Sequence, residues 1–105
     1  MNWHLIDTSE SNGFEIKFHV GPEDMHPNDF FDDDGETAAA IDAGQYEWFI
    51  AKVTASKAGV KLGADYLGGC CYISAHEFMD CPNYDDMVNQ AIAAAKAKLA
   101  ELQAA

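Results

Sequence analysis

Apolar residues recur every three or four positions across the last quarter of the chain, and this stripe most constrains the fold. Such spacing places side chains on one face of an α-helix. The stripe consists of Tyr84, Met87, Val88, Ala91, Ile92, Ala95, Leu99 and Leu102. In a chain of 105 residues, a helix of this kind must bury its stripe against another element of the same domain.

Two predicted hairpins supply that element. Four apolar residues alternate with polar ones near the amino end, which is typical of a half-buried strand: Phe14, Ile16, Phe18 and Val20. Residues 3–6 also suit a strand. The polar connector 7–13 ends in Asn-Gly and predicts a hairpin loop somewhat longer than the tightest turns. The sequence therefore predicts that the first two strands are antiparallel.

The second hairpin begins with residues 46–56, which are rich in aromatic and β-branched side chains and predict a central strand. Residues 57–59 predict a turn and residues 60–67 a further strand. Gly68-Gly69 breaks or bulges that strand before it resumes at residues 70–73.

Helix-start signals appear twice after this hairpin. Ser74 and Glu77 fit a capping box, which predicts a short helix over residues 75–79. Asn83 is the expected N-cap of the last helix. Earlier in the chain, residues 36–43 predict two helical turns that end at Gly44.

Together these patterns predict an α+β fold, an antiparallel sheet of about four strands with the C-terminal amphipathic helix packed on one face. Residues 1–105 are expected to form one domain, because domains cluster at roughly 100–150 residues. Within it, residues 21–45 are expected to form an acidic insertion of loop and short helix.

The charge balance is strongly acidic. Eighteen Asp and Glu face six lysines and no arginine, which gives a net charge of −12. Direct binding to nucleic acid is excluded on this ground, because it needs cations that neutralise phosphates. An anionic membrane surface is disfavoured for the same reason. No apolar run approaches the ~20 residues of a membrane helix, and no signal peptide pattern is visible.

The cysteine count also bears on location. Cys70, Cys71 and Cys81 make an odd number, and the first two are sequence neighbours that would point to opposite faces of a strand. Reduced thiols in the cytoplasm are therefore expected rather than a disulfide framework.

Metal and catalytic motifs are incomplete. An EF-hand loop with Gly35 at its sixth position would place Phe30 and Ile41 at positions that need carboxylates. His76-Glu77 lacks the second histidine of a zinc protease, because Asp80 stands in its place. We therefore expect no cofactor, no metal and no enzymatic activity. Calcium binding of another kind, and a cysteine nucleophile paired with His19 or His76, remain open alternatives.

A run of like charge is the strongest functional signal. From Phe18 to Ala51 there are nine carboxylates and no lysine. Such density destabilises a fold by self-repulsion, and a basic groove on a DNA- or RNA-handling protein is its natural counterpart. Adjacent aromatics within the run could anchor an interface or pin the loop to the core. The predicted contact residues are Glu23, Asp24, Asp29, Phe30, Phe31, Asp32, Asp33, Asp34, Glu36 and Asp42.

Small size, strong acidity, a compact α+β plan and no catalytic signature together resemble the small inhibitor proteins of phages and mobile elements, notably the anti-CRISPR and anti-restriction proteins. The resemblance is to a class and assigns no residue a role. It implies a non-enzymatic inhibitor that binds a CRISPR-Cas or restriction effector and blocks its nucleic-acid site, as a DNA mimic does. The alternative is a phage or plasmid accessory or adaptor protein whose acidity serves only solubility.

Overall fold

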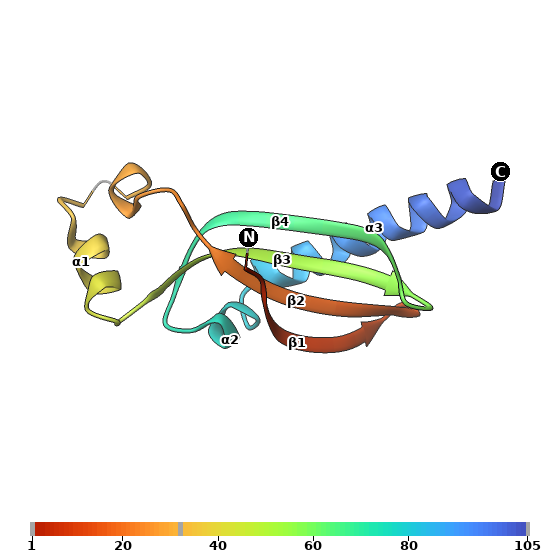
Figure 1. Ribbon diagram of the computed structural model, residues 1–105, viewed down its shortest axis with the longest axis horizontal. Coiled ribbons are helices and arrows are strands. Elements are labelled where there is room, and N and C mark those ends of the chain that lie inside the picture. Colours follow the sequence, from red (N-terminus) through yellow and green to blue (C-terminus); the bar gives the residue numbers. More distant parts are fainter. Residues whose placement is uncertain (1, 32, 105) are drawn as a thin grey trace.

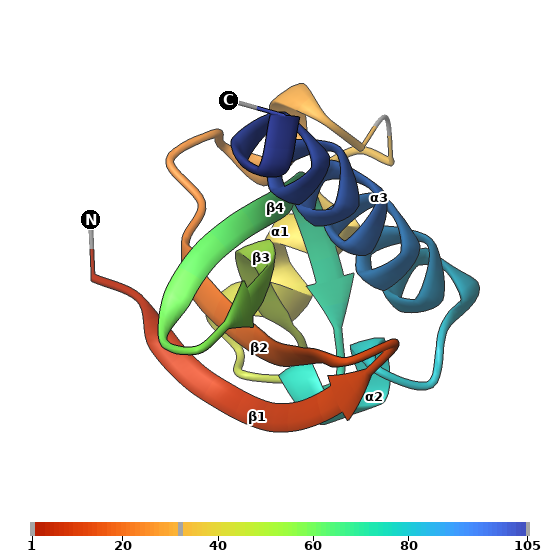
Figure 2. The same cartoon turned by 90° about the vertical axis from the view of Figure 1, so that its right-hand side faces the viewer.

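The computed structural model describes residues 2–31 and 33–104. Four antiparallel strands form one sheet in sequence order, and helix α3 lies against one face of it (Figures 1 and 2). The strands are β1 (His4–Ser11), β2 (Phe14–Pro22), β3 (Glu47–Lys57) and β4 (Val60–Tyr72). The helices are η1 (Pro27–Asp29), α1 (Glu36–Asp42), α2 (Ala75–Phe78) and α3 (Pro82–Ala104). The predicted α+β fold is confirmed.

The core lies between the sheet and the helices α2 and α3. Alternate residues of β2 and β3 point into it, as the period-two pattern requires. Phe18 and Phe78 are fully buried, with ring centroids 5.6 Å apart. The helix side comes from the predicted stripe, of which Tyr84, Met87, Ala91, Ile92 and Ala95 are buried.

A glycine lets α3 approach the sheet closely. A Cβ atom on Gly63 of β4 would lie 2.2 Å from the carbonyl oxygen of Ala91 and 2.6 Å from the backbone nitrogen of Ala95. Both alanines are completely buried. Small residues on both elements therefore set the distance between the helix and the sheet, and with it the depth of the core.

Two boundaries differ from the sequence prediction. The connector 7–13 is mostly strand, because β1 runs to Ser11 and only Asn12 and Gly13 form the turn. Both turn residues have positive φ, 53° and 82°, as a two-residue Asn-Gly hairpin turn requires. The polar residues that suggested a loop fit an edge strand that lies largely exposed to solvent.

The N-cap prediction at Asn83 was also wrong. Helix α3 begins at Pro82, so Asn83 lies inside its first turn. Proline suits the first helical position because the backbone N–H that it lacks would have no partner within the helix there. The helix end before Gly44 is confirmed for α1. At the start of α2 the structure shows one half of the predicted capping box, in which the Ser74 hydroxyl accepts a hydrogen bond from the backbone N–H of Glu77.

The predicted interruption at Gly68-Gly69 is a bulge within a continuous strand. Phe49 pairs with Cys70 and Ala51 with Leu67, so β4 carries one more residue than β3 across this step. Gly69 has a φ of 67°, a conformation that favours glycine. The backbone N–H of Gly69 in this bulge donates to a side chain instead of to the neighbouring strand.

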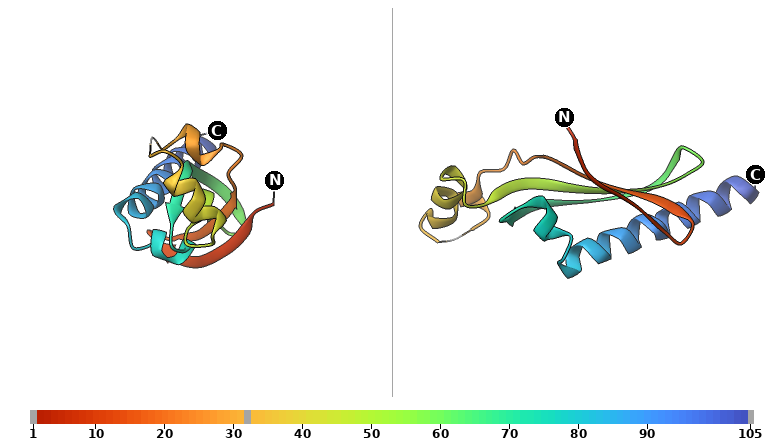
Figure 3. Two further views of the ribbon diagram at one scale, coloured as in Figure 1. Left: turned by 90° about the vertical axis from the view of Figure 1, so that its left-hand side faces the viewer. Right: turned by 90° about the horizontal axis from the view of Figure 1, so that it is seen from below.

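The molecule is elongated, with principal extents of 53 × 25 × 22 Å. The segment between β2 and β3 projects beyond the sheet at one end, and the last turns of α3 run past it at the other (Figures 1 and 3). Across the described residues, no helix has both the length and the apolar character needed to cross a membrane.

We expect Gly63→Ala to destabilise the protein by about 2 kcal/mol or more, because the added methyl group would push α3 off the sheet. In an open strand the same change would stabilise by roughly 0.5–1 kcal/mol. Urea denaturation shows whether the substitution lowers or raises the free energy of unfolding. An unchanged or raised free energy of unfolding would show that the helix does not lie this close to β4.

Candidate functional site

The projecting segment is the candidate site. We call residues 23–46 the acidic end; this segment has eight carboxylates and no lysine, and it contains η1 and α1. All of the predicted contact residues belong to it. Asp32 is among them but lies outside the described residues.

Glu23 ties the acidic end to the sheet. Its Oε2 atom accepts a hydrogen bond of 2.8 Å from the backbone N–H of Gly69, in the bulge of β4. Its Oε1 atom accepts another, of 3.1 Å, from the backbone N–H of Met25. Glu23 directly follows β2, so this contact carries the chain across β3 to the far strand. Its carboxylate is therefore engaged within the protein rather than free for a partner.

An aromatic cluster completes this attachment. The Trp48 indole of β3 donates a hydrogen bond of 2.8 Å to the carbonyl oxygen of Met25. The rings of Phe30 and Phe31 lie 5.9 and 5.8 Å from the Trp48 ring, centroid to centroid. Phe30 also covers Gly69, where an added Cβ atom would lie 2.9 Å from the ring.

The two phenylalanines thus pin the segment to the sheet, which was one of their two predicted roles. Phe31 is half-buried, whereas Phe30 remains 53% exposed and still offers ring surface to solvent. Sequence reasoning missed Trp48 as a member of this cluster. Its place on the face of β3 opposite Phe49 was the available signal, but its partners lie more than fifteen residues away.

Asp33 is engaged as well. Its Oδ2 atom accepts hydrogen bonds from the backbone N–H and the hydroxyl of Thr37, in the first turn of α1. A carboxylate at a helix start satisfies an N–H group and interacts favourably with the helix dipole. Substituting Asp33 would therefore disturb α1 and would not report cleanly on partner binding.

Five further carboxylates of the acidic end face solvent. They are Asp24, Asp29, Asp34, Glu36 and Asp42, all predicted contact residues. Within the described chain the single ion pair joins Lys17 to Glu15, on the sheet. The exposed group is therefore concentrated at one end of the molecule and is not neutralised there by the protein's own lysines.

Two lysines lie on the sheet near His19. Lys52 of β3 pairs across the strands with His19 of β2, and its Nζ atom lies 4.8 Å above the Trp3 ring. Burial lowers the pKa of His19, and the neighbouring charges of Lys52 and Lys17 lower it further.

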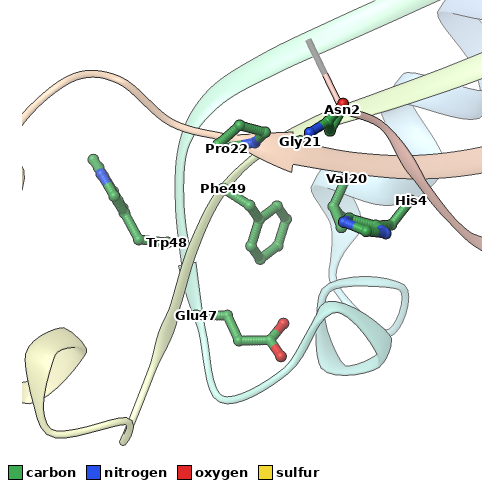
Figure 4. Close-up of a pocket in the computed structure, with 8 residues that line it drawn as sticks. All are labelled: Asn2, His4, Val20, Gly21, Pro22, Glu47, Trp48 and Phe49. Atoms are coloured by element: carbon green, nitrogen blue, oxygen red, sulfur yellow. The ribbon is translucent and has the colours of Figure 1, made fainter.

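A pocket of about 420 Å³ opens where β1, β2 and β3 meet beside the acidic end. Figure 4 shows the Phe49 ring among Val20, His4 and Glu47, with the Trp48 side chain pointing away toward the acidic end. The Glu47 carboxylate is already engaged within the protein, because its Oε2 atom accepts a hydrogen bond of 2.9 Å from the backbone N–H of Ala75 in α2. The one carboxylate that lines this pocket therefore holds α2 against β3 and is not free to bind a ligand.

Cys70 and Cys71 do not have the environment of nucleophiles. Burial, with a smaller contribution from the Glu23 carboxylate, raises the pKa of Cys70 to about 11, and burial also raises that of Cys71. A reactive cysteine needs the opposite shift. No three His, Cys, Asp or Glu side chains are grouped to hold a metal ion in the part of the chain that the structure describes.

Glu23→Ala should lower the free energy of unfolding by about 2 kcal/mol, because it leaves the amides of Gly69 and Met25 without their charged acceptor. Asp24→Ala is the matched control, since it removes one charge from the exposed neighbouring residue. Chemical denaturation of both variants tests the difference. Equal stabilities would mean that the Glu23 contacts do not hold the acidic end.

We expect the protein to lose stability in mild acid because of His19. Its lowered folded-state pKa means that the unfolded chain binds this proton more readily. Stability should therefore fall as the pH drops below about 6.5, the usual pKa of histidine, until the folded-state value is passed. Comparing His19→Gln with the unchanged protein across this window isolates the effect. A profile as steep in the variant would contradict it.

Comparison with protein-family models, with curated proteins and with solved structures found no match to this chain. The candidate site therefore rests on the chain's own residues. Those residues place an exposed, unneutralised group of carboxylates on a segment that internal hydrogen bonds and aromatic contacts hold in place.

Proposed function

We propose that this protein is a non-enzymatic inhibitor that binds a nucleic-acid-handling defence effector, of the CRISPR-Cas or restriction type, in the cytoplasm. The acidic end covers the basic surface with which the effector holds DNA or RNA. It acts as a mimic of the phosphate backbone and does not itself bind nucleic acid or a membrane.

The observation that carries this proposal is the concentration of exposed carboxylates on an attached, projecting segment. Five of them face solvent on residues 24–42, and the Glu23 and Trp48 contacts limit how far that segment can move. A charged group that is already positioned loses less conformational entropy on binding than a flexible tail does. Duplex DNA likewise offers closely spaced negative charges, and a groove built for it attracts any comparable surface.

The projection of the acidic end also favours this role. It lies beyond the sheet, so it can enter a groove without a collision between the effector and the body of the molecule (Figure 1). Phe30 supplies an apolar contact beside Asp29, because half of its ring surface is exposed. An aromatic side chain surrounded by charge is a common interface anchor.

The test mixes the protein with purified CRISPR-Cas effectors and restriction enzymes before labelled duplex DNA is added. We expect DNA binding by at least one effector, followed by fluorescence anisotropy, to be lost. The inhibition should weaken as salt rises toward ~1 M, where the Debye length falls to about 3 Å. Inhibition that is insensitive to salt would contradict phosphate mimicry, and so would unchanged DNA binding by every effector.

Charge variants locate the contact. Asp29→Asn, Asp34→Asn and Glu36→Gln together should weaken inhibition about tenfold, because three exposed ion pairs at roughly 0.5 kcal/mol each approach the ~1.4 kcal/mol of one decade. The control neutralises three exposed carboxylates elsewhere, Glu10→Gln, Asp86→Asn and Glu101→Gln. If both triple variants lost inhibition equally, the acidic end would not be the contact surface. Only the net charge of the protein would then matter.

A further inference from the structure

A second surface lies at the end of the molecule opposite the acidic end. There the last turns of α3 run past the sheet beside the β3–β4 turn (Figures 1 and 3). An open groove of about 340 Å³ lies between them, lined by Lys57, Ala58, Val60, Leu62, Leu99 and Leu102. Val60 and Leu102 are each more than half exposed. The stripe of α3 thus continues past the core and leaves an apolar surface uncovered.

The charge around this groove is opposite to that of the acidic end. The segments 57–62 and 95–102 carry four lysines and one carboxylate, Glu101. Lys61, Lys96 and Lys98 are exposed, as is Lys57 in the lining. Lys57 lines the groove, and Lys96 and Lys98 lie within one helical turn of its Leu99 and Leu102, so three of the six lysines of a chain with net charge −12 lie at or beside it.

From these two surfaces we infer that the groove receives the acidic end of a second copy of this chain. The exposed side of Phe30 contacts the apolar groove, and the exposed Asp29, Asp34 and Glu36 beside it face the lysines. The fit combines an exposed aromatic ring with an apolar lining, and exposed carboxylates with a cationic rim. Both halves of the contact are present on every copy.

Charge also selects this arrangement over a symmetric one. A groove-to-groove dimer would bring the lysines of the two grooves together, and an end-to-end dimer would bring carboxylates against carboxylates. Juxtaposed like charges are unfavourable at interfaces. The contact is therefore head-to-tail and joins different surfaces of the two copies, so it leads to open chains or rings rather than closed two-fold dimers.

The acidic end can then bind either the groove of another copy or a basic effector. A copy bound in a groove has its carboxylates covered, and a basic effector competes for the same surface. The inference stands apart from the proposed inhibition, because self-association needs no effector and is measured on the purified protein alone.

Sedimentation velocity over a concentration series tests it. We expect the weight-average sedimentation coefficient of the unchanged protein to rise with concentration. Lys96→Glu with Lys98→Glu should abolish the rise by altering the groove, and Asp29→Lys with Asp34→Lys should abolish it by altering the acidic end. All four residues are exposed, so the fold is preserved. Leu102→Asp is a second groove variant that changes the apolar contact alone.

Mixing the variants gives the decisive result. The two charge-reversed proteins should each be monomeric alone yet associate when mixed, because the unchanged acidic end of one matches the unchanged groove of the other, and the two reversed surfaces also carry opposite charges. Leu102→Asp mixed with Lys96→Glu/Lys98→Glu should remain monomeric, since neither of these proteins has an unchanged groove. A monomer at all concentrations would overturn the inference. It would also be overturned if a groove variant were monomeric while the acidic-end variant still associated.

Discussion

The hydrogen bond between the Glu23 carboxylate and the Gly69 amide is the contact on which the rest of the acidic end depends. Eight carboxylates in 24 residues repel one another, and nothing in their own sequence gathers them into a defined shape. Glu23 converts one of those charges into an attachment to the opposite strand of the sheet. Trp48 and the two phenylalanines then cover that attachment and limit its exposure to water.

The bulge in β4 makes this attachment available. In a regular antiparallel ladder an edge strand such as β4 directs every second amide at its neighbour, whereas the extra residue of a bulge is left unpaired. Gly69 supplies the backbone conformation and the absence of a side chain that the Phe30 ring requires. Gly69, which would weaken a regular strand, thus provides both a backbone N–H that binds a carboxylate and room for an aromatic ring.

Local patterns in the sequence predicted the sheet, the long helix, the helices α1 and α2 and the bulge, because each depends on residues close together in the chain. The short 3₁₀ helix η1 was not predicted, since its residues were interpreted as loop. The two-residue period of Phe14, Ile16 and Phe18 was enough to predict a strand, and the three-to-four-residue period of the α3 stripe was enough to predict a helix. The connector 7–13 was misread because polarity alone does not separate a loop from an exposed edge strand. Asn83 was misread because proline is itself a favoured first helical residue.

The candidate site was only partly predictable. Its location in the acidic run followed from charge counting, but the division of that run into internal and exposed carboxylates did not. Glu23 meets Gly69 across 46 residues of sequence, and Trp48 meets Met25 across 23. No pattern within a short window records such contacts. As a result Glu23 and Asp33 looked equivalent to their exposed neighbours, although the fold uses both of them itself.

Hydrogen exchange at individual backbone amides, followed by NMR, tests most directly whether the acidic end is held in place. If Glu23 accepts the Gly69 N–H as described, that amide exchanges about tenfold or more slowly than in an unstructured peptide, and the Met25 amide is slowed with it. If both amides exchange at the unstructured rate, the carboxylates belong to a loose tail and the positioned surface described above does not exist.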